Sequence, residues 1–270
     1  MRVALAQVTS SSDVGENLRL VADGVARAAE QGAQLVVLPE ATMRAFGHPL
    51  DEVAEPLDGP FAGEVARIAE RAGVHVVVGM FTPSPEQRPG SGRRKVVNTL
   101  LVTGPGTHVG YDKIHLFDAF GFAESDTVSP GSAPLTFECG GLRVGLATCY
   151  DLRFPALFTA LARAGAQAVV VAASWGAGPG KAEQWDVLVR ARALDCTSWV
   201  LACGQSEPAA AGVEAVPGAP TGIGRSAVVG PDGSLLARAG AGPELLLADV
   251  DADTVERVRQ QIPVLANARL

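Results

Sequence analysis

Three residues whose side chains can cooperate in acyl transfer each follow a stretch that predicts a buried β-strand. They are the thiol of Cys149, the amine of Lys113 and the carboxylate of Glu40. In α/β folds, the residues just past the carboxyl ends of strands line the crevice that binds ligands. We therefore expect the three side chains to meet in one site.

Cys149 lies where the apolar run 142–147 meets a helical pattern that begins at Pro155. This order predicts a strand, a sharp turn at the cysteine and then a helix. A thiol at such a turn lies near the positive end of a helix, which favours the thiolate. Cys149 is thus the candidate nucleophile.

The three residues together suggest one mechanism. Glu40 would take the proton of the thiol, and the Cys149 thiolate would attack a carbonyl carbon. Lys113 and the backbone N–H of Tyr150 would stabilise the resulting oxyanion. Glu40 would then protonate the leaving amine and activate water against the thioester. This mechanism needs no histidine, and His115 remains open between a pocket group and a satisfied histidine.

Lysine is rare in this chain, with three lysines among 22 cationic side chains, which draws attention to Lys113.

Glu124 lies in the long segment 112–132. It is either a solvated loop acid or a second carboxylate that orients Lys113.

Strand patterns alternate with helical patterns and then outnumber them. Strands are expected at 2–8, 34–38, 74–81, 96–103, 107–111, 142–147, 168–173, 199–203, 224–229, 234–239 and 245–250. Helices are expected at 17–30, 61–71, 155–164, 181–196 and 253–260. Continuous apolar strands indicate an α/β fold with helices covering the sheet. The excess of strands favours a four-layer α-β-β-α sandwich over one doubly wound sheet.

Loops are expected at 83–95, 112–132 and 206–220, and the long irregular segment 112–132 is typical of a functional loop. The loop 83–95 is expected to be mobile, and whether it gates the pocket stays open. No repeat or linker divides the chain, so residues 1–270 are expected to form one domain.

Composition excludes several classes of protein. The net charge of −7 argues against nucleic acid or an acidic membrane as a partner. No apolar run approaches the length of a membrane span, and the first residues lack the shape of a signal peptide. We therefore expect a cytoplasmic protein. Cys139, Cys196 and Cys203 lack metal-site spacing and are expected to be buried free thiols.

Four motifs follow one another along the chain. They are Leu35-Val36-Val37-Leu38-Pro39-Glu40, Tyr111-Asp112-Lys113-Ile114-His115-Leu116, Ala147-Thr148-Cys149-Tyr150-Asp151-Leu152-Arg153-Phe154-Pro155 and Gln184-Trp185-Asp186-Val187-Leu188-Val189-Arg190-Ala191-Arg192-Ala193-Leu194. In this order and spacing they resemble the nitrilase superfamily of carbon–nitrogen hydrolases. The resemblance extends from the first strand to about residue 250.

The resemblance implies a four-layer α-β-β-α fold and a catalytic triad of Glu40, Lys113 and Cys149. It implies Glu124 as an additional functional glutamate, no metal and no organic cofactor. It also implies a small-molecule amide substrate and a homodimer or a larger homo-oligomer.

The turn after Cys149 resembles the amidase branch that includes ω-amidase and deaminated glutathione amidase. Those enzymes act on substrates with a carboxylate, which Arg153 or Arg44 could bind. Alternatively, Arg153 forms a structural ion pair with Asp151 or a neighbouring acid. Tyr150 and Trp175 complete the residues expected at the substrate.

Three features depart from those amidases and leave the substrate open. Arg225 precedes Ser226 where a histidine is common, Trp175 stands at the expected pocket wall, and the segment 118–122 differs.

The sequence is also compatible with functions other than an amidase. An N-carbamoyl amide hydrolase, a nitrilase or a non-catalytic binding member would share the fold. A redox thiol protein is disfavoured because no resolving cysteine lies near Cys149 in the sequence. The segment 176–181 is not a phosphate loop, because Trp175 replaces its first glycine and Ala182 follows the lysine.

Overall fold

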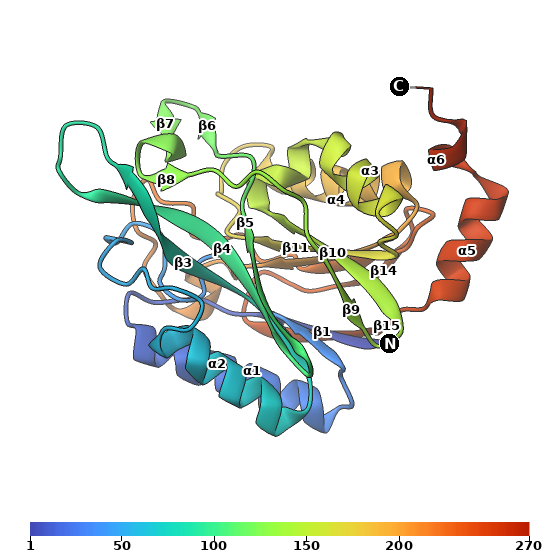
Figure 1. Cartoon of the computed structure of the whole chain (residues 1–270), viewed down its shortest axis with the longest axis horizontal. Coiled ribbons are helices and arrows are strands. Elements are labelled where there is room, and N and C mark those ends of the chain that lie inside the picture. Colours follow the sequence, from blue (N-terminus) through green and yellow to red (C-terminus); the bar gives the residue numbers. More distant parts are fainter. Residues whose placement is uncertain (270) are drawn as a thin grey trace.

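The computed structural model describes residues 1–269, which form two β-sheets flanked by helices (Figure 1). The strands of the first sheet are β1 (Arg2–Gln7), β2 (Leu35–Val37), β3 (His75–Gln87), β4 (Arg94–Gly104), β5 (Thr107–Asp112), β8 (Val128–Ser129) and β15 (Glu244–Asp249). Their order is β15-β1-β2-β3-β4-β5, and β8 pairs with β4.

The second sheet is built from the middle and later parts of the chain. Its strands are β9 (Thr136–Cys139), β10 (Leu142–Thr148), β11 (Ala168–Ala173), β12 (Trp199–Gly204), β13 (Ala227–Val229) and β14 (Leu235–Arg238). Their order is β14-β13-β12-β11-β10-β9. A separate hairpin joins β6 (Asp118–Ala119) to β7 (Phe122–Ala123).

Six helices lie among the described residues, and the first four of them cover the outer faces of the two sheets. The six helices are α1 (Val14–Glu30), α2 (Pro60–Ala72), α3 (Pro155–Arg163), α4 (Lys181–Cys196), α5 (Ala252–Gln261) and α6 (Val264–Asn267), with short 3₁₀ turns η1 (Glu124–Asp126), η2 (Cys149–Arg153) and η3 (Ala209–Ala211). Figure 1 shows α1 and α2 below the sheets and α3 and α4 above them. The predicted α-β-β-α sandwich is therefore confirmed.

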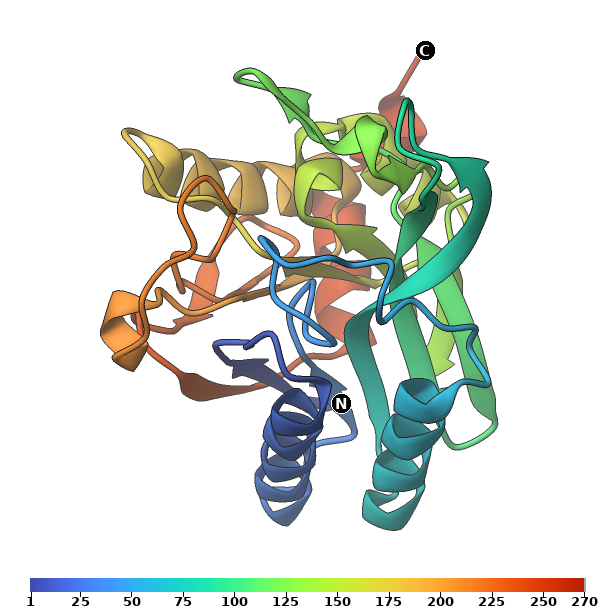
Figure 2. The same ribbon diagram turned by 90° about the vertical axis from the view of Figure 1, so that its left-hand side faces the viewer.

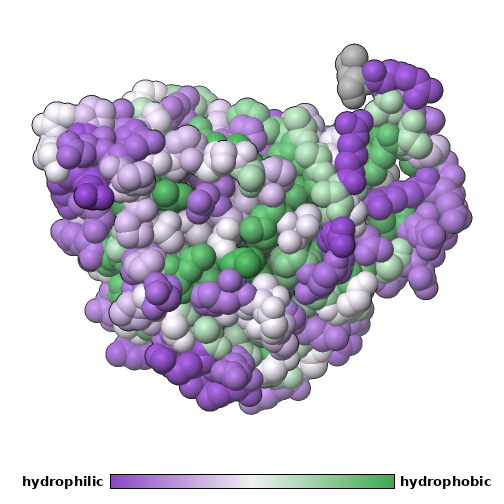
Figure 3. Space-filling view, in the orientation of Figure 1, coloured by the Kyte–Doolittle hydropathy of each residue, from purple (hydrophilic) through white to green (hydrophobic). Residues whose placement is uncertain are grey.

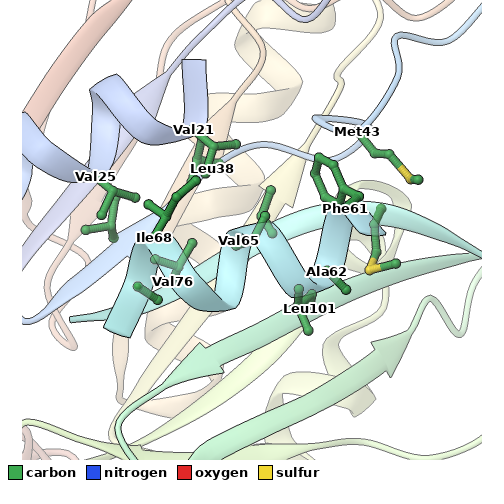
Figure 4. Packing of buried hydrophobic residues seen from close by; sticks show 14 of the residues in the cluster. Val21, Val25, Leu38, Met43, Phe61, Ala62, Val65, Ile68, Val76 and Leu101 are labelled. Atoms are coloured by element: carbon green, nitrogen blue, oxygen red, sulfur yellow. The ribbon is translucent and has the colours of Figure 1, made fainter. Parts of the chain in front are cut away.

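Three apolar layers hold the sandwich together. One lies between α1, α2 and the first sheet, one lies between the two sheets, and one lies between the second sheet and α3 and α4. Figure 4 shows the first layer, in which Val25 of α1 and Ile68 of α2 lie near Val76 of β3. Figure 3 shows hydrophilic residues along the lower edge of the molecule, where the outer faces of α1 and α2 lie.

Helix α2 shows how local sequence sets these elements. Pro60 occupies the first turn, where its missing N–H costs nothing, and Gly73 ends the helix in the left-handed conformation. Between them Phe61, Val65 and Ile68 recur at helical spacing and are buried.

Each sheet has a parallel centre whose strands end toward the same edge. β1, β2 and β3 run parallel in the first sheet, and β10, β11 and β12 run parallel in the second. Residues that follow β2 and β10 can thus meet at one place between the layers. The first sheet closes late in the sequence, because β15 pairs antiparallel with β1 and places Asp249 opposite Arg2.

The structure corrects two expectations about loops. Most of 83–95 belongs to the extended β3–β4 hairpin, and only 88–93 lies between the two strands. Arg88 and Arg93 of this tip both bind Asp51, at 3.0 and 2.7 Å. The segment 112–132 is also partly regular, since it holds the β6–β7 hairpin, η1 and β8.

Among residues 1–269, no helix combines the length and apolar character that crossing a membrane requires.

Candidate active site

A cavity of about 390 Å³ opens beside the carboxyl ends of β2, β5 and β10. Its walls include Glu40, Lys113, Glu124 and Cys149, so the structure brings these four predicted residues together. Figure 2 shows segments that supply other parts of its wall. They are the β6–β7 hairpin at the top, the β3–β4 hairpin at the right and the loop 206–220 at the left.

Cys149 directly follows β10 and begins the turn η2. Its φ of 45° lies in the left-handed region, which is uncommon for a residue with a side chain and often marks a functional site. The side chain is partly exposed to the cavity, and its Sγ lies 3.9 Å from the carbonyl oxygen of Ser174.

The turn at Cys149 is fixed from behind by the buried carboxylate of Asp151. One oxygen, Oδ2, accepts from Thr148 N at 2.9 Å and from the Tyr111 hydroxyl at 2.7 Å. The other, Oδ1, lies 2.9 Å from His115 N and 2.7 Å from His115 Nδ1. Asp151 thereby ties the turn to the segment that carries Lys113.

His115 is a supporting residue in this arrangement. Its ring stacks on Phe154 with centroids 3.7 Å apart while its Nδ1 pairs with Asp151. The question left open by the sequence is thus answered, because His115 is a satisfied histidine behind the cavity wall.

Lys113 is buried between two carboxylates. Its Nζ lies 3.1 Å from Glu40 Oε1 and 3.0 and 2.9 Å from the two oxygens of Glu124. Glu124 Oε2 also accepts from Phe117 N at 2.7 Å, which fixes the carboxylate. Glu124 is therefore a buried partner of Lys113, as the second of the two interpretations predicts.

Glu40 is held from several sides. Oε1 accepts from Asn98 Nδ2 at 2.7 Å in addition to Lys113, and Oε2 accepts from Ser174 N at 2.8 Å. Its backbone packs so closely against Gly79 that a Cβ there would lie 2.7 Å from Glu40 Cα.

Asn98 is a polar residue of the site that was not predicted from the sequence. It lies inside β4, not after a strand end, and its side chain is fully buried. A buried asparagine between valine and threonine in an apolar strand was the available signal, since buried polar side chains require partners.

The electrostatics of the site determine the resting state of the thiol. Burial raises the pKa of Cys149 well above its usual value, and the negative charge of Glu40 acts in the same direction, while Lys113 opposes it. The expected bias toward thiolate is therefore wrong, and Cys149 rests as a neutral thiol that needs a base. Burial lowers the pKa of Lys113, but the charges of Glu40 and Glu124 outweigh burial and raise it, so Lys113 stays charged.

The three expected substrate residues also line the cavity. They are Tyr150, Arg153 and Trp175. Arg153 does not pair with Asp151, because its Nη2 donates to Gln184 Oε1 at 2.6 Å. Its guanidinium lies 5.1 Å from the ring centroid of Trp175 and 5.9 Å from that of Tyr150.

The structure corrects two other expectations about the pocket. Arg44 lies outside the cavity wall and pairs with Glu52 at 3.2 Å. Arg225 also lies outside it and binds Asp186, so this departure from related amidases does not alter the pocket. Phe122, from the third departing segment, does line the cavity.

A family model described as carbon-nitrogen hydrolase matches residues 2–260. A hydrolase of Mycobacterium tuberculosis is 55% identical over 99% of this chain and 95% of its own length. The deaminated glutathione amidase of Escherichia coli O157:H7 is 37% identical over 100% of this chain and 97% of its own. The human omega-amidase NIT2 is 34% identical over 99% and 95%.

The fold has matches among solved structures. The crystal structure of Saccharomyces cerevisiae Nit3, described as a member of branch 10 of the nitrilase superfamily, superposes with a TM-score of 0.81 at 30% identity. The match covers 98% of this chain and 94% of that one. With the family model matching nearly its whole length, this chain belongs to the carbon–nitrogen hydrolase family.

Proposed function

We propose that this protein is an amidase that releases ammonia from a small carboxamide through a thioester on Cys149. The observation that carries the proposal is the convergence of a thiol, a carboxylate and an ammonium in one cavity. These three groups supply a nucleophile, a proton acceptor and a fixed positive charge. The relatives named as amidases support this choice within the family.

Glu40 acts as the general base and acid in this proposal. A neutral Cys149 thiol must lose its proton to attack, and Glu40 is the carboxylate of the cavity wall whose charge acts most strongly on that thiol. Proton transfer to Glu40 would produce the attacking thiolate only as the C–S bond forms. The same proton would then pass to the departing ammonia, which keeps the proton count balanced.

Lys113 and the N–H of Tyr150 stabilise the oxyanion. Lys113 is buried and held in place by two carboxylates, so its charge is preorganised. Tyr150 lies in the first turn of η2, where backbone N–H groups lack partners within the helix. Water activated by Glu40 would hydrolyse the thioester and restore the free thiol.

The test measures ammonia released from a panel of short carboxamides by the wild-type protein and by Cys149→Ala. Mass spectrometry of the quenched reaction should show an acyl group on the peptide that contains Cys149. Ammonia from nitriles alone, or amine from carbamoyl compounds alone, would replace the amidase by another reaction of the family. Failure to hydrolyse any of these while Cys149 still reacts with iodoacetamide would overturn the catalytic proposal.

A further inference from the structure

Lys181 is a cation of the cavity wall that the proposed chemistry does not use. It begins α4, and the cavity lies against it. Among residues 1–269, its side chain forms no salt bridge and no hydrogen bond. Its Nζ lies instead 4.5 Å from the ring centroid of Phe120 and 5.5 Å from that of Phe117.

The other lysines of the chain have carboxylate partners. Lys113 lies between Glu40 and Glu124, and Lys95 pairs with Glu86 at 3.1 Å outside the cavity. Lys181 therefore keeps an uncompensated charge in a chain that uses lysine sparingly.

Arg153 is a second uncompensated cation on the same wall. It bonds to the neutral Gln184 and forms no ion pair within residues 1–269. Trp175 connects the two cations, because its ring lies under Arg153 and its Nε1 donates to the carbonyl oxygen of Lys181 at 2.9 Å. Burial and the charge of Arg153 both lower the pKa of Lys181, which is the result of placing two like charges near each other.

No acid in the cavity can balance this pair. Within the described chain, the acidic residues of the wall are Glu40 and Glu124, and both are engaged by Lys113. Arg88 also reaches the wall, but Asp51 already pairs with it. Arg153 and Lys181 are therefore both available to bind the negative charges of a molecule in the cavity.

We propose that Lys181 is a specificity-determining residue that binds a second carboxylate of the substrate, beside one that faces Arg153. The pocket would thus select amides whose acyl part carries two carboxylates close together, since Trp175 packs against Arg153 and fixes the backbone of Lys181 on the same wall. The rings of Phe120 and Phe117 lie beside Lys181 Nζ and leave its hydrogen-bond donors free for an anion. This inference rests on the proposed function, because it assumes that the amide reaches Cys149.

The test uses three amides that differ in charge. Pentanamide has no carboxylate, 4-carbamoylbutanoate has one, and (2-carbamoylethyl)propanedioate has two. For the wild-type protein kcat/KM should be largest for the dianion. Lys181→Met should lower kcat/KM for the dianion by about tenfold, mainly through KM, and should change the value for the monoanion far less.

Two further variants serve as controls for charge and position. Lys181→Arg should retain most of the preference for the dianion because it keeps the cation. Lys95→Met removes a lysine outside the cavity and should leave all three values unchanged. An unchanged ratio of dianion to monoanion in Lys181→Met would overturn the inference.

The affinity of the Cys149→Ala variant for the dianion, measured by titration calorimetry, separates this inference from the proposed function. Adding Lys181→Met to that variant should weaken binding about tenfold and reduce its dependence on salt. If no amide is hydrolysed but this binding difference persists, the amidase proposal fails and the anion site stands. If amides are hydrolysed and neither binding nor kcat/KM depends on Lys181, the anion site fails and the amidase stands.

Discussion

Lys113 contacts both carboxylate oxygens of Glu124 but only one oxygen of Glu40. The second oxygen of Glu40 instead accepts from Ser174 N. Glu124 therefore neutralises part of the positive charge of Lys113. In the proposed mechanism this makes Glu40 a better proton acceptor. The two glutamates are chemically the same, yet their hydrogen bonds give them different roles.

The first prediction concerns Glu124→Gln. Without the negative charge of Glu124, Lys113 should bind Glu40 more tightly and make Glu40 a weaker base. We expect kcat to fall about 100-fold with little change in KM, while the variant stays folded. Steady-state kinetics and a thermal melt measure both effects. A variant with the kcat of the wild type would contradict the role given to Glu124.

The second prediction concerns the ionisation of Cys149. Its pKa is raised by burial and by Glu40, so the thiol should titrate well above the usual value of about 8.5. Glu40→Gln removes a negative charge and should lower this pKa, although it should abolish most turnover. The difference in ultraviolet thiolate absorbance between each protein and its Cys149→Ala counterpart measures the pKa.

The other thiols cancel in this difference, because both proteins of each pair keep Cys139, Cys196 and Cys203, whose pKa values burial also raises. The direction of the pKa shift of Cys149 also determines how the free energy of unfolding depends on pH. The folded pKa of Cys149 exceeds the unfolded one, so its contribution to stability is complete below about pH 8.5 and is lost as the pH rises. A Cys149 pKa that rises in Glu40→Gln would refute the electrostatic coupling.

The third prediction concerns Asp151→Asn. The amide cannot accept from Thr148 N, His115 and Tyr111 in the way that the carboxylate does. We expect the free energy of unfolding to fall by about 3 kcal/mol and activity to fall as the Cys149 turn loosens. Tyr111→Phe removes only one donor and should cost about 1 kcal/mol. Equal losses for the two variants in urea denaturation would argue against the central place of Asp151.

The fourth prediction concerns Gly79→Ala. The new Cβ would lie 2.5 Å from the backbone N of Ala41 and 2.7 Å from Glu40 Cα, so the backbone that carries Glu40 must move. We expect a loss of about 1–3 kcal/mol and a lower kcat. Gly63→Ala in α2 meets no atom within 4 Å and should stabilise by about 0.5–1 kcal/mol. Unaltered kcat in Gly79→Ala would show that this contact does not position Glu40.

The layers and seven residues of the cavity could be predicted from the sequence because most of the relevant signals are local. Glu40, Lys113 and Cys149 each follow a strand, and the periods of the apolar residues mark both strands and helices. The strand β9 was not predicted, since Thr136–Cys139 is short and alternates in burial. No local pattern shows that so short a segment pairs with β10.

Residues that act through distant partners were harder to predict. Asn98 binds Glu40 across 58 positions of sequence, and the Trp175 side chain joins Arg153 to the backbone of Lys181 only after the chain has folded. The bias toward thiolate expected from the nearby helix end was wrong, because the pKa of Cys149 depends more on burial and on Glu40.

The pairing of β15 with β1 has a consequence for biosynthesis. During synthesis, β1 is made before every other strand of the two sheets, whereas β15 emerges after all of them. The nascent chain therefore carries an open edge at β1 until β15 has been made. Premature products that stop before Glu244 would keep that edge unpaired and be prone to aggregate.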